Sequence, residues 1–324
     1  MTHIRNLETL YLQQPSVITI GVFDGVHNGH RYLIKRLVET AHADDLLAVV
    51  LTFFPHPDQV VQGIQGRYYL TTAEQRADYL LSLGVDYVIT HPFDENVRRM
   101  RAARFVDQLV THLRPKKLWV GANFALGFKR EGNVEFLTQQ GINRGFSVHA
   151  IELLQAENTQ ATITSTLIRE ALFRGEVEQA RDWLGRAYQI SGEVVHGQKR
   201  GRTIGFPTAN IDVWEQQVIP ANGVYAGWAC LGPERLMAVT NIGVRPTFNN
   251  SDVTIEAHLL DFERDIYGET LTVSFETYLR PEVKFDNLQA LIDQIHADVG
   301  KGREYLLELP DLEERKITDC NPRK

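Results

Sequence analysis

The chain has 324 residues, of which 43% are hydrophobic and 23% are charged, and its formal net charge is −7 at pH 7. These values are typical of a globular protein with room for two domains, and the negative charge argues against non-specific binding to nucleic acid. No apolar run is long enough to span a membrane, the N-terminus lacks a signal-peptide core, and the two cysteines, Cys230 and Cys320, are too far apart in the sequence to suggest a disulfide framework. We therefore expect a cytoplasmic protein.

The first informative stretch connects a predicted buried strand at 17–22 to a predicted helix that starts near residue 31. Between them lies a glycine-rich loop that contains His27 and His30. Backbone N–H groups and the positive end of the helix dipole converge at such a turn, so it suits phosphate, and the imidazoles add donors. The residues predicted to contact phosphate here are Gly21, Phe23, Asp24, Gly25 and Gly29.

Two simpler interpretations apply to this loop. His27 and His30 could be a metal pair, although no cysteine or acidic cluster nearby completes a site. Asp24 could only cap the turn, as Asp often does.

Strand and helix patterns alternate through the rest of the first half. Apolar runs predict strands at 46–53, 85–90, 118–121 and 146–153. Thr71–Glu74 is typical of a capping box before a helix that ends near Gly84, and residues 102–113 have helical spacing. This order predicts a doubly wound parallel sheet flanked by helices, with ligands at the carboxyl ends of its strands.

Three further segments in this half could carry function. Pro55, His56 and Pro57 follow the strand at 46–53, although the prolines could simply end it. Asn123 and Phe124 precede a basic turn that could be merely solvated. Ser165 and Thr166 open a helix with Arg169 one turn later, which suits either an N-cap or a phosphate site. No GxxxxGK[ST] loop is present in the sequence, which disfavours a P-loop kinase.

Together, the HxGH loop, the TFxPHP loop, the VGxNFxxG stretch and the serine/threonine helix start resemble the adenylyltransferase module of the bifunctional riboflavin kinase/FMN adenylyltransferase (FAD synthetase) family. The resemblance implies a Rossmann-like nucleotidyltransferase domain. It also implies catalytic roles for His27, His30 and Arg169, phosphate contacts for Ser165 and Thr166, and flavin contacts for the segments at 55–57 and 123–124. Leu126 replaces a usual Phe, which bears on flavin stacking, and Thr164 replaces a frequent Ser, a mild change. Leu167 replaces a common Arg and removes one possible phosphate ligand, so Arg169 is expected to carry more of the phosphate binding.

The pattern changes after a short predicted helix at 175–185. Short strands are expected at 188–195, 224–230, 236–242, 253–260 and 270–278, followed by a helix at 287–299. We therefore predict an antiparallel β-barrel with one packed C-terminal helix. The predicted domains are 1–186 and 187–310, followed by a polar tail at 311–324.

The second domain begins with a glycine-rich basic stretch, residues 192–210. Its glycines allow backbone to approach phosphates, and its cations can neutralise them, although a mobile hairpin is the simpler interpretation. Thr208 and Asn210 alternate along an extended chain and face the same side, where their oxygens could help to hold Mg²⁺. The predicted ATP contacts in this stretch are Gly192, His196, Gly197, Arg200, Gly201 and Arg202.

This stretch and later segments, including Gly223–Tyr225 and Ile255–Phe262, resemble the riboflavin kinase signature. The resemblance implies that Glu256 is the catalytic carboxylate; without that context, an exposed Glu on an alternating strand would be the better interpretation. The implied reactions are phosphorylation of riboflavin to FMN and adenylylation of FMN to FAD plus pyrophosphate, with ATP as co-substrate and Mg²⁺ as cofactor.

Two alternative functions fit part of the sequence. A related nucleotidyltransferase with a non-flavin substrate leaves the Pro-Thr-Ala-Asn barrel unexplained. An OB-type nucleic-acid module would carry aromatic and basic residues on its strands, whereas the strand at 253–260 carries Glu256 and His258. We expect no nucleic-acid or membrane partner, and the sequence indicates no oligomeric state.

Overall fold

The protein was analysed as a computed structural model, which describes residues 1–151, 163–197, 201, 204–246 and 251–309. The predicted tail at 311–324, Cys320, Arg200 and Arg202 lie outside this part of the chain. The described residues form two compact units that divide between Ser165 and Thr166. This division places the segment 166–186 with the second unit, whereas the change of sequence pattern falls near residue 186.

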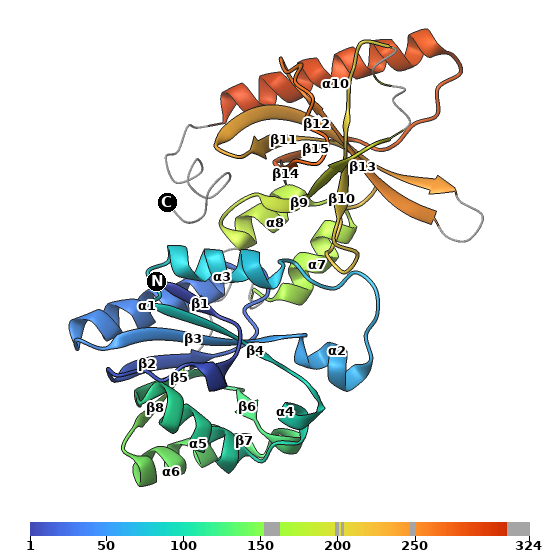
Figure 1. The fold of residues 1–324 in the computed structure, drawn as a ribbon. Helices are drawn as coiled ribbons and strands as arrows, with labels where there is room; N and C mark the ends of the chain where they lie inside the picture. The colour runs from blue at the N-terminus through green and yellow to red at the C-terminus, as the bar shows by residue number, and fades with distance from the viewer. Residues whose placement is uncertain (152–162, 198–200, 202–203, 247–250, 310–324) are drawn as a thin grey trace. The chain divides into compact units, whose positions relative to one another are not determined.

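The first unit contains a six-stranded sheet in the order β1-β4-β3-β2-β5-β8 (Figure 1). All neighbouring strands are parallel, as predicted for a doubly wound fold. The strands are β1 (Thr2–Ile4), β2 (Ser16–Ile20), β3 (Leu47–Phe54), β4 (Tyr87–Pro92), β5 (Pro115–Gly121) and β8 (Ser147–Ile151). The short hairpin β6 (Ala125–Leu126) and β7 (Gly132–Asn133) follows β5.

Helices cover both faces of this sheet (Figure 1). Alternate strand residues explain the two layers: Val17 and Val50 pack with α1 and α3, whereas Ile18 and Leu51 pack with α5 and α6. The helices are α1 (Asn28–Ala43), α2 (Pro57–Gln62), α3 (Ala73–Ser82), α4 (Glu95–Arg99), α5 (Ala102–Leu113) and α6 (Val134–Arg144), with 3₁₀ turns η1 (Leu7–Thr9) and η2 (Phe128–Arg130).

The second unit is a β-barrel, as predicted. The order β12-β13-β10-β9-β14-β11, together with the β12–β11 pairing, closes a ring of antiparallel strands, and β15 also pairs with β11. The strands are β9 (Tyr188–Val195), β10 (Ala209–Val213), β11 (Gly223–Leu231), β12 (Glu234–Pro246), β13 (Ser251–Leu259), β14 (Thr270–Phe275) and β15 (Thr277–Arg280). Its helices are α7 (Ser165–Phe173), which begins at the last residue of the first unit, α8 (Val177–Leu184) and α10 (Leu288–Glu308).

Three local predictions were wrong. The capping box of α3 is formed by Thr72 and Gln75 rather than by Thr71 and Glu74, because the Thr71 hydroxyl bonds Asp24 instead. The predicted strand at 270–278 is broken at Glu276, which lies between β14 and β15 and whose N–H donates to the Ala226 carbonyl. Helix α10 continues past residue 299 to Glu308, because Gly302 lets it approach the barrel: an added Cβ would lie 3.0 Å from Val239.

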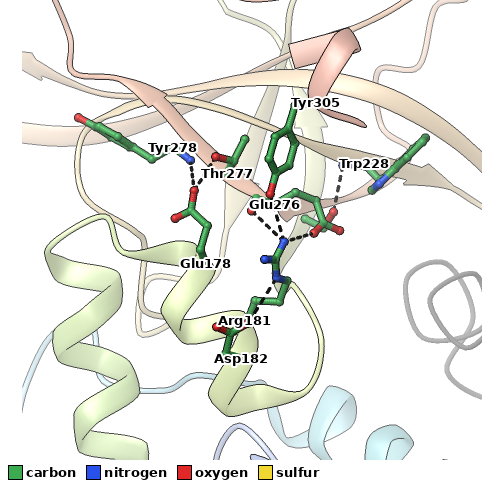
Figure 2. Close-up of polar contacts among 9 residues, drawn as sticks. Glu178, Arg181, Asp182, Trp228, Glu276, Thr277, Tyr278 and Tyr305 are labelled. Carbon is green, nitrogen blue, oxygen red and sulfur yellow. Dashed lines mark hydrogen bonds and ion pairs between the residues drawn. The ribbon is translucent and has the colours of Figure 1, made fainter. Parts of the chain in front are cut away.

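A polar cluster attaches α8 to the barrel (Figure 2). Arg181 Nη1 lies 3.3 Å from both Glu276 Oε2 and the Tyr305 hydroxyl. One turn earlier, Glu178 accepts hydrogen bonds from the Thr277 hydroxyl and from the Tyr278 N–H. The break between β14 and β15 is thus the point where α8 docks, which explains why α8 groups with the second unit.

Two further observations bear on the expectations about membrane spans and cysteines. Among the described helices, none is long and apolar enough to cross a membrane. Cys230 is buried on β11 and is disulfide-bonded, although the spacing of the cysteines suggested no disulfide framework.

Candidate active sites

The histidine loop follows β2 at the carboxyl edge of the parallel sheet. Phe23, Gly25 and Val26 all have positive φ angles, of 54°, 79° and 42°. Such backbone in a β-branched residue is strained and is held only by its surroundings. The loop turns directly into α1, whose N-cap is His27. The predicted strand and the turn into a helix are therefore confirmed, but α1 begins at Asn28, earlier than the expected start near residue 31, so Gly29 and His30 lie in its first turn.

The two histidines are stacked, with ring centroids 3.6 Å apart. His27 Nδ1 accepts the His30 N–H at 3.4 Å, so the ring proton of His27 is assigned to Nε2. Gly29 permits this packing, because a Cβ there would lie 3.2 Å from the His27 ring. The Phe23 ring meets His30 edge-on at 5.1 Å.

Burial sets the protonation state of His30. The pKa of His30 lies well below its usual value, first because burial disfavours the charged ring, and then because His27 and Arg76 add positive charge nearby. His30 Nδ1 is buried and has no hydrogen-bond partner among the described residues. A neutral imidazole with a free polar atom is therefore available to a ligand here.

Asp24 connects this loop to residues 70–71. Its carboxylate accepts hydrogen bonds from the Leu70 and Thr71 N–H groups and from the Thr71 hydroxyl, at 3.1–3.2 Å. The side chain is 1% exposed. These contacts fit the turn-capping interpretation better than a phosphate contact, since a carboxylate repels an anion.

The other predicted segments of the first unit also follow strand ends. Pro55 follows a cis peptide bond, and His56 is the N-cap of α2, its Nδ1 accepting the Asp58 N–H at 3.0 Å; Pro57 opens that helix. Phe124 packs against the core on the α5 side, and the Asn123 carbonyl accepts a hydrogen bond from Arg130. A structural role thus accounts for part of each segment.

The helix start at residue 165 reaches the histidine loop. The Ser165 hydroxyl donates to the Asp24 carbonyl at 2.9 Å. Thr166 is exposed, and Arg169, one turn into α7, is buried and belongs to the second unit. The contribution of Arg169 to adenylyl transfer stays a prediction.

A second polar cluster lies on the barrel around Glu256 of β13. Glu256 pairs in register with Asn210 of β10 on one side and with Asn241 of β12 on the other. The Thr208 hydroxyl lies 3.5 Å from Glu256 Oε2. The predicted same-side arrangement of Thr208 and Asn210 thus brings both to the carboxylate. Asn241 was missed, because sequence gives no register between strands.

The glycines near this cluster divide into two kinds. A Cβ on Gly197 would lie 2.2 Å from Asn210 Nδ2. A Cβ on Gly201 would lie 3.5 Å from Thr208 Oγ1 and 2.2 Å from the Phe206 carbonyl, so both glycines are next to the cluster, and close packing also accounts for Gly201. Gly192 lies within β9, where a Cβ would meet the Asp212 carbonyl at 2.0 Å. Close strand packing therefore explains Gly192 without a phosphate contact.

A cavity of about 270 Å³ adjoins the Glu256 cluster. It is lined on one side by Pro207 and Thr208 and on the other by residues 262–267, including Tyr267. His196 packs against Tyr267 with ring centroids 3.9 Å apart. The cluster therefore has an adjoining space in which part of a nucleotide could lie.

Comparison with known proteins decides the family. A FAD synthetase family model matches residues 11–167, and a riboflavin kinase model matches residues 184–306. The bifunctional riboflavin kinase/FMN adenylyltransferase of Listeria monocytogenes is 36% identical over 317 residues, covering 94% of this chain and 100% of that protein. This chain belongs to the bifunctional riboflavin kinase/FMN adenylyltransferase family.

Other relatives extend this assignment. The family member from Escherichia coli is 39% identical over 295 residues, covering 90% of this chain and 93% of its own. A solved structure named a macrolide-efflux protein, from Streptococcus pneumoniae, has a TM-score of 0.84 at 29% identity, covering 93% of this chain and 98% of that one. The fold is therefore shared over nearly the whole length.

Proposed function

We propose that this chain converts riboflavin to FMN and then FMN to FAD, consuming one ATP in each reaction. Residues 187–310 are assigned the kinase and residues 1–186 the adenylyltransferase. The matches of the two family models support this division, because they fall on the two stretches that contain the Glu256 cluster and the histidine loop.

In the kinase reaction, Glu256 accepts the proton of the riboflavin 5′-hydroxyl. The oxygen attacks the γ-phosphorus of ATP, and the bond from that phosphorus to ADP breaks. Thr208 and Asn210 present hydroxyl and amide oxygens, which suit Mg²⁺ whose other ligands are phosphates and water. When bound, Mg²⁺ offsets the charge on the phosphates.

The kinase site binds ATP beside this cluster. We assign the nucleotide to the cavity near Tyr267, where His196 packs, and the phosphates to the approach over Gly197 and Gly201.

In the adenylyltransferase reaction, the FMN phosphate attacks the α-phosphorus of ATP and pyrophosphate leaves. This nucleophile is already ionised, so the site needs donors more than a base. His27, through its Nε2–H, His30 and the start of α1 stabilise the phosphates, together with Ser165, Thr166 and Arg169. The segments at 55–57 and 123–124 contact the flavin. Because both reactions use ATP, we place the protein in the cytoplasm.

The main support for this proposal is that the histidine loop and the Glu256 cluster lie in separate compact units. Purified protein incubated with riboflavin, ATP and Mg²⁺ should yield FMN and FAD. His30→Ala should lower FAD formation from FMN at least about 100-fold, and Glu256→Gln should lower FMN formation by about 10²–10⁴-fold. Each variant is the control for the other, since it should retain the second reaction. Loss of both reactions in a folded single variant would refute the two-site assignment.

A further inference from the structure

One short segment, residues 69–76, holds the two loops that flank the first site. The Tyr69 hydroxyl accepts the His56 N–H at 2.7 Å. Leu70 and Thr71 donate to Asp24, and the Thr71 hydroxyl accepts the Gly25 N–H at 3.2 Å. This segment, which we call the brace, therefore contacts both the histidine loop and the loop at 55–57.

Arg76 is the innermost side chain of the brace. It is fully buried, at 0% exposed. Its Nη1 donates to the Val22 carbonyl at 2.7 Å, to the Thr52 hydroxyl at 3.2 Å and to the Phe53 carbonyl at 3.3 Å. The Thr52 hydroxyl also donates to Val22, at 2.7 Å. One guanidinium nitrogen thus ties the first residues of the histidine loop to the end of β3.

We propose that Arg76 is a positioning residue for adenylyl transfer, acting through the histidine loop rather than touching substrate. By joining the ends of β2 and β3, it fixes the strained backbone of residues 22–26, and with it the stacked His27 and His30. This inference rests on the proposed FMN adenylylation. No catalytic motif contains Arg76, and the sequence predicted only an ordinary helix here.

The charge of Arg76 adds a second effect on the same histidine. The groups that set the protonation of His30 are, after burial itself, His27 on α1 and Arg76 on α3. Both lower the pKa of His30. Removing the guanidinium should therefore let the pKa of His30 rise toward its usual value of about 6.5.

The test compares Arg76→Met and Arg76→Lys in the full chain, with Arg5→Met as the matched control. Arg5 pairs with Glu74, which lies on the same helix as Arg76, but the side chains of Arg5 and Glu74 are exposed, at 77% and 54%. For each variant, FMN adenylylation is measured for kcat, KM and pH dependence. Riboflavin phosphorylation by the same sample reports whether the second unit is intact.

We expect Arg76→Met to lower kcat/KM for adenylylation about 100-fold, the loss typical of a catalytic group misplaced by about 1 Å. The limb of its pH profile that reports His30 should move to higher pH. Arg76→Lys keeps the charge and a donor but not the fork, so about a tenfold loss with an unmoved limb is expected. Kinase activity and Arg5→Met should stay within about twofold of wild type.

Unchanged adenylylation kinetics in Arg76→Met, or a lowered melting temperature with kcat and the pH profile unmoved, would overturn the inference. If Arg76→Met does not fold, Arg76→Lys decides, and wild-type kinetics in that variant would overturn it as well. Absence of FAD formation by the wild-type chain would instead contradict the proposed function, so the two failures are distinguishable.

Discussion

Removing the positive charge that α8 presents to the barrel should destabilise the second unit. Glu276 is 2% exposed in its side chain, and Arg181 is its cationic partner at 3.3 Å (Figure 2). Burial lowers the pKa of Arg181, but Tyr305 and Glu276 outweigh it, so the pKa is raised overall. The guanidinium is thus charged, and Arg181→Met would leave the Glu276 carboxylate buried without it.

The expected loss follows from the burial of the two groups. Truncating one partner of a buried ion pair costs about 3–5 kcal/mol, because the remaining charge is uncompensated. Arg181 is 21% exposed in its side chain, so water can screen the residual charge in part. We therefore expect about 2–3 kcal/mol of lost unfolding free energy. At about 3 °C per kcal/mol for a unit of this size, the melting temperature should fall by about 6–9 °C.

The assay is thermal inactivation of riboflavin phosphorylation in the full chain. Arg174→Met is the matched control, because Arg174 pairs with Glu176 at 2.8 Å while both side chains are about half exposed, at 54% and 47%. Such surface pairs contribute at most about 1 kcal/mol. Replacing both buried partners, as Arg181→Met with Glu276→Leu, should recover part of the loss. A midpoint shift in Arg181→Met no larger than in Arg174→Met would refute the reasoning.

Two further predictions concern pH and backbone space. Burial lowers the pKa of His91 and outweighs the opposing effect of Glu8 and Asp94, so the unfolded chain binds more protons than the folded chain. His91 therefore contributes stability above pH ~6.5 that is lost as pH falls, by up to about 1.4 kcal/mol per pH unit. His91→Gln should reduce the pH dependence of the urea-unfolding free energy measured between about pH 7.5 and 5.5. Gly197→Ala should lower kinase kcat/KM at least about tenfold by displacing Asn210, whereas Gly300→Ala, with open space around it, should leave kinetics unchanged; equal kinetics in both would contradict the assignment of Asn210.

Elements with strong local signals were predictable from the sequence. Helix α5 has the predicted bounds because its apolar residues recur at helical spacing, and β9 has them because its apolar run is bounded by turns. The predicted position of the α3 capping box was wrong by one residue because of a tertiary contact. Thr71 is a good N-cap by type, but its hydroxyl is used by Asp24, 47 residues away in sequence, so Thr72 takes the role.

Site residues divide in the same way. Motif residues such as His27, His30 and Thr208 could be proposed because their type and spacing imply chemistry, whereas Glu256 was indicated only by the resemblance to the riboflavin kinase signature. Arg76 and Asn241 could not, because each acts through a partner in another strand or loop. Arg76 looks like one more charged residue of an amphipathic helix, and only the fold reveals that it is fully buried.

Under the proposed function, the difference between the two nucleophiles accounts for the different residue types of the two clusters. A riboflavin hydroxyl must lose a proton, a role that suits the carboxylate of Glu256 beside neutral Thr208 and Asn210. An FMN phosphate needs no base, and a free carboxylate next to two polyanions would repel both. The histidine loop does contain one acid, Asp24, but the N–H groups of Leu70 and Thr71 take up its oxygens. These donors partly offset the charge of Asp24, so Asp24→Asn should weaken the loop geometry without removing a catalytic base.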